Sequence, residues 1–164
     1  MKDLLLRLKR DQRGVAAVEF ALWSVFIFVV LMAGFDFGIY SIQKAQLAKS
    51  VSEASNFAFA TRKNVDVSQI RQYVNASTDL PGAQPTVTVT CNVNQTCVNT
   101  NRPCACLSAT GVLSTATCNS NCSNGAPAGF FVTIEARYTY QQPIMPSGFL
   151  DGAVMVEKST VRLQ

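Results

Sequence analysis

The chain has 164 residues, of which 48% are hydrophobic, and it carries a formal net charge of +4, six cysteines and no histidine. This length fits one small domain with a membrane helix. The absence of histidine excludes Ser-His-Asp and Cys-His catalytic arrangements, and the sequence contains no Walker A loop or dinucleotide-binding glycine pattern. We therefore expect a protein that is not an enzyme, with no catalytic residues, no metal and no cofactor.

Residues 1–14 form a basic N-terminal leader. They hold five basic and two acidic residues, a balance of +3, whereas residues 15–164 hold nine basic and eight acidic residues, a balance of +1. Positive charge beside an apolar segment keeps that side in the cytoplasm. The positive net charge of the leader therefore predicts the orientation of the chain in the membrane. Without interleaved basic and aromatic residues it does not predict nucleic-acid binding.

Residues 15–40 are long and apolar enough to cross a membrane as a helix. No charged residue occurs from Phe20 to Phe35, and about 20 residues suffice for one span. The alternatives are a buried core helix and a cleaved secretory signal. A run of this length is unusual in the core of a small soluble domain, and a secretory signal has a shorter apolar region of about 7–15 residues. We predict a retained transmembrane helix, with everything after it across the membrane.

Glu19 is a carboxylate inside this apolar segment. Such a charge costs roughly 2.5–3.5 kcal/mol on insertion scales, which makes it a functional candidate. One interpretation leaves Glu19 hydrated at the cytoplasmic interface. The other pairs it with a cation: cleavage after Gly14 would create an amine on Val15, one helical turn before Glu19. That amine could belong to the same chain or to a neighbour.

The segment RGVAAVEFAL at 13–22 resembles the type IV prepilin signal, in which a peptidase cuts after the glycine and the glutamate becomes the fifth mature residue. Together with GFDFG at 34–38, it resembles the TadE-like pseudopilins, minor subunits of the bacterial tight-adherence (Tad) pilus system. The resemblance covers about residues 10–45. The family often has a proline after Glu-Phe-Ala-Leu, whereas this chain continues Trp-Ser-Val, so a family-like kink is not expected.

The resemblance implies cleavage between Gly14 and Val15 and a role for Glu19 and Phe20 in subunit register and assembly. The implied partners are membrane lipid, a prepilin peptidase, other pilin or pseudopilin subunits and the Tad assembly machinery. The implied location is the bacterial inner membrane, which the protein spans once, with its C-terminal domain in the periplasm. The protein either stays in this membrane or is incorporated in a cell-surface pilus or at its tip. The major pilin is much shorter, so 164 residues favour a minor subunit. No adhesion target is indicated.

The outer end of the apolar run carries Gly34 and Gly38, a spacing that lets helix backbones approach closely. Backbone flexibility is an equal explanation for this pair. Asp36 lies between the two glycines, and we expect it at the outer membrane interface.

The helix is predicted to continue as an amphipathic extension over 41–60. No glycine or proline interrupts residues 39–59, and one helix over 15–60 would be about 70 Å long. Apolar residues at helical spacing predict a face that packs on the outer domain: Tyr40, Leu47, Val51, Ala54 and Ala58. Polar residues are predicted on another face: Gln43, Gln46, Ser50 and Glu53.

Residues 61–164 are predicted to form an extracytoplasmic α+β domain. Asp66 or Ser68 can cap a short helix. Alternating residues predict strands at 86–90, at 129–140 and within 151–163. A small antiparallel sheet against the outer half of the long helix would bury both apolar faces. Within the clearest strand, Tyr138 and Tyr140 are candidates for core packing or for a binding surface.

All six cysteines fall within loops predicted over 91–122, a polar segment that cannot build its own core. In an oxidising compartment their even number predicts up to three disulfides, with fifteen possible connectivities. Metal binding is the alternative, but the spacing lacks Cys-x-x-Cys and does not match common zinc sites. The predicted disulfide residues are Cys91, Cys97, Cys104, Cys106, Cys118 and Cys122.

Two hypotheses of function follow. The first is a minor pilin or pseudopilin that is processed after Gly14 and takes part in assembly of a tight-adherence type IV pilus. The second is an uncleaved single-pass anchor that displays a disulfide-rich binding or adhesion module. The two differ in whether the mature chain keeps residues 1–14.

Overall fold

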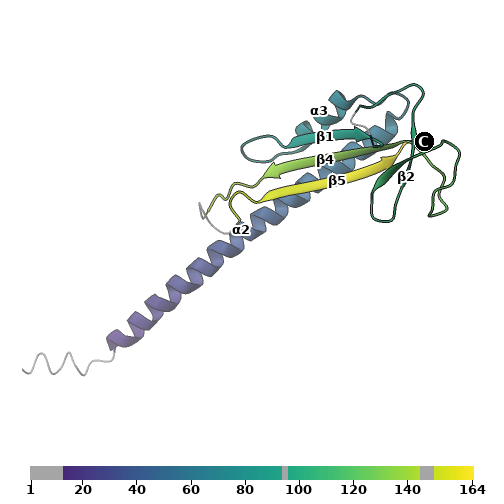
Figure 1. The fold of residues 1–164 in the computed structure, drawn as a ribbon. Helices are drawn as coiled ribbons and strands as arrows, with labels where there is room; N and C mark the ends of the chain where they lie inside the picture. Colours follow the sequence, from purple (N-terminus) through teal and green to yellow (C-terminus); the bar gives the residue numbers. More distant parts are fainter. Residues whose placement is uncertain (1–12, 94–95, 145–149) are drawn as a thin grey trace, which may run out of the picture.

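The structure is a computed structural model that describes residues 13–93, 96–144 and 150–164. Most of the predicted leader lies outside the described residues. One long helix carries a small α+β head on its second half (Figure 1), which confirms the predicted fold class. The elements in chain order are α2 (Arg13–Ala60), α3 (Val67–Ser77), β1 (Thr86–Cys91), β2 (Cys104–Leu107), β3 (Leu113–Ala116), β4 (Phe131–Thr139) and β5 (Val154–Arg162).

Helix α2 runs without interruption for 48 residues. Because it contains no proline, every residue after its first turn can donate its amide to the preceding turn. Its first half projects away from the head and its second half lies along the sheet (Figure 1). The single continuous helix expected from the sequence is confirmed.

The head is built on an antiparallel sheet in the order β1-β4-β5. Strand β4 is central, with Ile134 opposite Val89 of β1 and Ser159 of β5. Alternate residues of β4 and its flanks face the same way and are buried, as the period of two predicts. These residues are Phe130, Val132, Ile134, Ala136, Tyr138 and Tyr140. Both tyrosines therefore belong to the core.

The second half of α2 supplies the other side of this core. Leu47, Val51, Ala54 and Ala58 are buried, as predicted. The predicted polar face is partly wrong, because Gln43 and Ser50 are also buried. Steps of four and three residues place them on the same helical stripe as Leu47 and Ala54. The buried hydroxyl of Ser50 is satisfied within the helix, since it donates to the carbonyl oxygen of Leu47 at 2.9 Å.

Helix α3 packs beside α2 and begins at an N-cap, Asp66. The Asp66 carboxylate accepts the amide of Ser68 at 2.8 Å and that of Gln69 at 3.4 Å. The hydroxyl and amide of Ser68 lower the pKa of this carboxyl. The cap fixes the start of α3, and its buried residues Ile70 and Val74 join the core.

The cysteine-rich segment has more regular structure than the predicted loops. Strands β2 and β3 form a separate two-stranded antiparallel sheet, with Leu107 opposite Leu113. Disulfides join Cys91 to Cys97, Cys104 to Cys118, and Cys106 to Cys122. All six sulfurs are consumed in these bonds, so none is available as a metal ligand. Two bridges tie β2 to the segment after β3, which stabilises a hairpin with few apolar side chains of its own.

Candidate functional site

The first half of α2 is an apolar surface with no covering from the head. It is long and apolar enough to span a membrane, and none of its most apolar window is buried. Large side chains are exposed around its circumference, including Phe20, Trp23, Phe28 and Leu31. A helix that is apolar on all sides is stable in lipid or among other helices, but not in water. Among the described residues there is therefore one apolar helix, near the N-terminus, that is suited to membrane anchoring.

The predicted processing site lies at the start of this surface. Helix α2 begins at Arg13, so Gly14 and Val15 are in its first turn. Glu19 and Phe20 lie on the exposed surface, and Phe20 is 75% exposed. Within the described residues, Glu19 takes part in neither of the two salt bridges. The helix thus presents this carboxylate outward, one turn after Val15.

The glycine pair does not serve packing between the described parts of the chain. A Cβ atom built on Gly34 or Gly38 would meet no heavy atom within 4 Å. Neither the head nor the described loops therefore require small residues here. Their use in contact with another helix remains a prediction.

Asp36 forms the junction between the exposed half of α2 and the head. It lies on the helix, yet it is fully buried. Its carboxylate accepts the side-chain amide of Gln142 at 2.9 Å and the backbone amide of Ile144 at 3.3 Å. Its backbone carbonyl accepts the hydroxyl of Tyr140 at 3.0 Å. The segment that follows β4 is thereby fastened to one turn of the helix.

The sequence predicts Asp36 at the outer membrane interface but does not indicate its partners. Those partners lie 104 to 108 residues later in the chain. Aromatic packing adds to the fastening, because the rings of Tyr40 and Tyr140 meet edge to face at 5.3 Å. A charged residue inside an apolar helix was the one available signal. The position of this charge indicates a functional or structural role for Asp36, but it does not show which groups form hydrogen bonds with the carboxylate.

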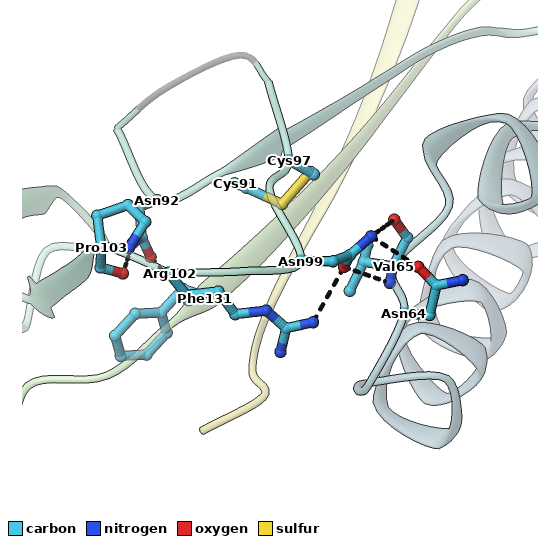
Figure 2. The surroundings of a disulfide bond; sticks show 9 residues. All are labelled: Asn64, Val65, Cys91, Asn92, Cys97, Asn99, Arg102, Pro103 and Phe131. Atoms are coloured by element: carbon cyan, nitrogen blue, oxygen red, sulfur yellow. Dashed lines mark hydrogen bonds between the residues drawn. A yellow bond between two sulfur atoms is a disulfide. The ribbon is translucent and has the colours of Figure 1, made fainter.

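The opposite end of the head is organised by the loop between Cys97 and β2. Figure 2 shows Asn99 bridging this loop to the turn after α2. Its side-chain oxygen accepts the amide of Val65 at 2.8 Å, and its amide nitrogen donates to Asn64 at 2.7 Å. The same oxygen accepts Arg102 at 3.0 Å. The cysteine-rich segment is thus attached to the helix by side-chain hydrogen bonds as well as by disulfides.

Comparison with known proteins identifies the helix segment. The family model of TadE-like proteins matches residues 14–56. The chain carries a TadE-like N-terminal segment. This confirms the resemblance drawn from its motifs, over the residues that the family model matches. Comparisons with curated proteins and with solved structures gave no match.

The TadE-like match covers the apolar half of α2, Asp36 itself and most of the helix under the head. It therefore includes every residue of the predicted processing and assembly site. It ends before α3, the sheet and the disulfides. The head therefore lies outside the TadE-like match.

Proposed function

We propose that this chain is a minor pilin or pseudopilin, a structural subunit that takes part in assembly of a tight-adherence type IV pilus. The observation that carries this proposal is the TadE-like match on a helix whose most apolar stretch has no buried residue. An extended apolar helix with a small head at its end is suited to bundling with similar helices. The basic leader would keep the N-terminus in the cytoplasm and the head in the periplasm.

Processing after Gly14 is the second part of the proposal. A prepilin peptidase would remove the leader and leave Val15 with a new amine. This amine would carry positive charge at neutral pH, since the pKa of an α-amino group is about 7.7–8.0. It would lie one helical turn from Glu19, within reach on the same helix or on a neighbour.

Glu19 would then set the register between subunits. An unpaired carboxylate is costly in an apolar surrounding, and the described part of the chain offers it no cation. A Val15 amine from an adjacent subunit would compensate that charge when the helices are at the correct relative height. Any other height would prevent this pairing between neighbouring subunits.

The mature N-terminus tests the processing step. Mass spectrometry of the native membrane-associated protein should find a chain that begins at Val15, whereas Gly14→Ala should keep the leader. A native chain that retains Met1 would contradict processing. It would favour instead an uncleaved anchor that displays a disulfide-rich binding module.

Substitution of Glu19 tests the register. Glu19→Ala should be processed and folded normally but should reduce the amount of pilus recovered by shearing by at least about tenfold, because a charge pair in an apolar surrounding is lost. The matched control is Glu53→Ala on the same helix. Glu53 pairs with Lys49 at 3.8 Å on the surface, a contact worth little. Normal piliation by Glu19→Ala would contradict the proposed role.

A further inference from the structure

A basic pocket opens at the end of the head that lies farthest from the start of α2. Its volume is about 580 Å³. The C-terminal end of β5 and strand β2 lie at this end of the molecule (Figure 1). The lining includes Lys63, Arg102 and Arg162 and contains no aspartate or glutamate. Three cationic side chains therefore share one cavity that has no acidic side chain in its wall.

The two guanidinium groups are held in place by backbone oxygens. Arg102 donates to the carbonyl oxygen of Lys63 at 3.1 Å, and its guanidinium carbon lies 4.8 Å from the centre of the Phe130 ring. Arg162 donates to the backbone oxygen of Gln164 at 2.8 Å and to that of Ala128 at 3.3 Å. Neither arginine is in a salt bridge within the described residues. Their positions are fixed, and no aspartate or glutamate side chain in the described part of the chain pairs with them.

One donor of Arg102 has no acceptor. The Nε atom of Arg102 is buried and makes no hydrogen bond within the described residues. Its burial closes this atom off from the pocket, so an oxyanion bound there would meet the outer nitrogens of the Arg102 guanidinium. Such an anion has the charge and the geometry that guanidinium groups favour.

The backbone is also shaped around this site. A Cβ atom on Gly129 would collide with the backbone oxygen of Gln164 and with the guanidinium of Arg162. Glycine is thus required here for Arg162 to lie against the chain. The substitution Gly129→Ala would displace this arginine from the pocket wall.

We propose that this pocket binds an anionic saccharide, with the carboxylate or sulfate of the sugar against the cationic side chains. Its volume is in the range of small-molecule sites, whereas a protein partner needs about 800 Å² of surface per side. The lining amides of Asn101 and Asn119 suit hydroxyl groups, since an amide both donates and accepts. The site lies outside the TadE-like match. It therefore goes beyond the assembly role and does not rest on it.

The test uses the full chain in uncharged detergent micelles, titrated by calorimetry with sodium glucuronate and with glucose as the neutral counterpart. Glucuronate should bind, with weaker affinity at higher salt, and glucose should not. Lys63→Gln should weaken glucuronate binding by about tenfold, the effect of one charge-assisted hydrogen bond. This variant keeps the backbone carbonyl that Arg102 needs. Arg71→Gln, an exposed residue outside the pocket, should bind as the native chain does.

Three results would overturn the proposal. The first is equal binding of glucose and glucuronate. The second is unchanged affinity in both Lys63→Gln and Gly129→Ala, provided that their circular dichroism is native. The third is binding of a peptide rich in aspartate and glutamate where glucuronate fails, which would assign the pocket to an acidic protein segment. None of these results depends on processing after Gly14, so they are distinct from a failure of the pilus proposal.

Discussion

Two carboxylates on the same helix have opposite surroundings. Glu19 is exposed on the apolar half of α2, whereas Asp36 is completely buried where the head begins. The head satisfies Asp36 through Gln142, Ile144 and further contacts. Nothing in the described chain does the same for Glu19. One charge is thus compensated within the subunit, whereas the other requires water, lipid headgroups or a second subunit.

The apolar residues of α2 divide in the same way. Leu47 is 0% exposed against the sheet, and Leu22 is 69% exposed on the first half. Both lie in one continuous helix, so local conformation is identical and only the packing differs. The second half of α2 therefore contributes to the stability of the head. The first half is available for lipid and for other helices.

The two leucines provide the strongest test of this division. Leu47→Ala should lower the free energy of unfolding of the head by about 2–5 kcal/mol, because it removes buried methyl groups and leaves a cavity. Leu22→Ala should leave that free energy unchanged. Urea unfolding in micelles, followed by the near-ultraviolet circular dichroism of the tyrosines, measures both. Equal losses in the two variants would contradict the division of the helix.

A second prediction compares the two carboxylates directly. Asp36→Ala should destabilise the head by about 1–3 kcal/mol, because it leaves two partly buried amide donors without their acceptor. Hydrogen exchange should rise at Ile144 and in the end of β5 that lies nearest. Glu19→Ala is the matched control and should not change the stability of the head. If Asp36→Ala exchanged like the native chain, the junction would not be the fastening that its hydrogen bonds indicate.

A smaller effect is expected from the tyrosine at the junction. Tyr140→Phe removes the hydroxyl that donates to the Asp36 carbonyl and should cost about 0.5–1.5 kcal/mol at neutral pH. Burial raises the pKa of Tyr140 in the folded chain, with further contributions from Asp36 and Tyr138. A raised pKa means that the tyrosine contributes its full stability below its unfolded pKa of about 10. That stability is lost as pH rises through the folded pKa.

The pH dependence provides the measurement. The free energy of unfolding of the native head should fall above about pH 10. In this range Tyr140 ionises more readily in the unfolded chain than in the folded one, where it is buried. Tyr140→Phe should show a shallower decline, with the remainder due to Tyr138, whose pKa is also raised by burial. Identical alkaline profiles in the two proteins would show that Tyr140 does not titrate in this range.

Local patterns along the chain were enough to predict the parts of the protein that repeat a period. The apolar run predicts the helix because its composition leaves the backbone no other stable state in lipid. Strict alternation in β4 predicts which side chains face the core, since successive residues of a strand point to opposite faces. The TadE-like motif is likewise local, so the order of its residues is enough to identify it.

The parts that depend on distant partners were decided by tertiary packing alone. Local patterns did not predict that Gln43 and Ser50 are buried or that Asp36 is bonded to Gln142. They also did not predict the β2–β3 hairpin or the basic pocket. Fifteen disulfide connectivities were possible, and the fold selects one by bringing particular sulfurs together. A period specifies which face a residue occupies along its own element. What that face meets is set by chain segments that only the packed structure brings into contact.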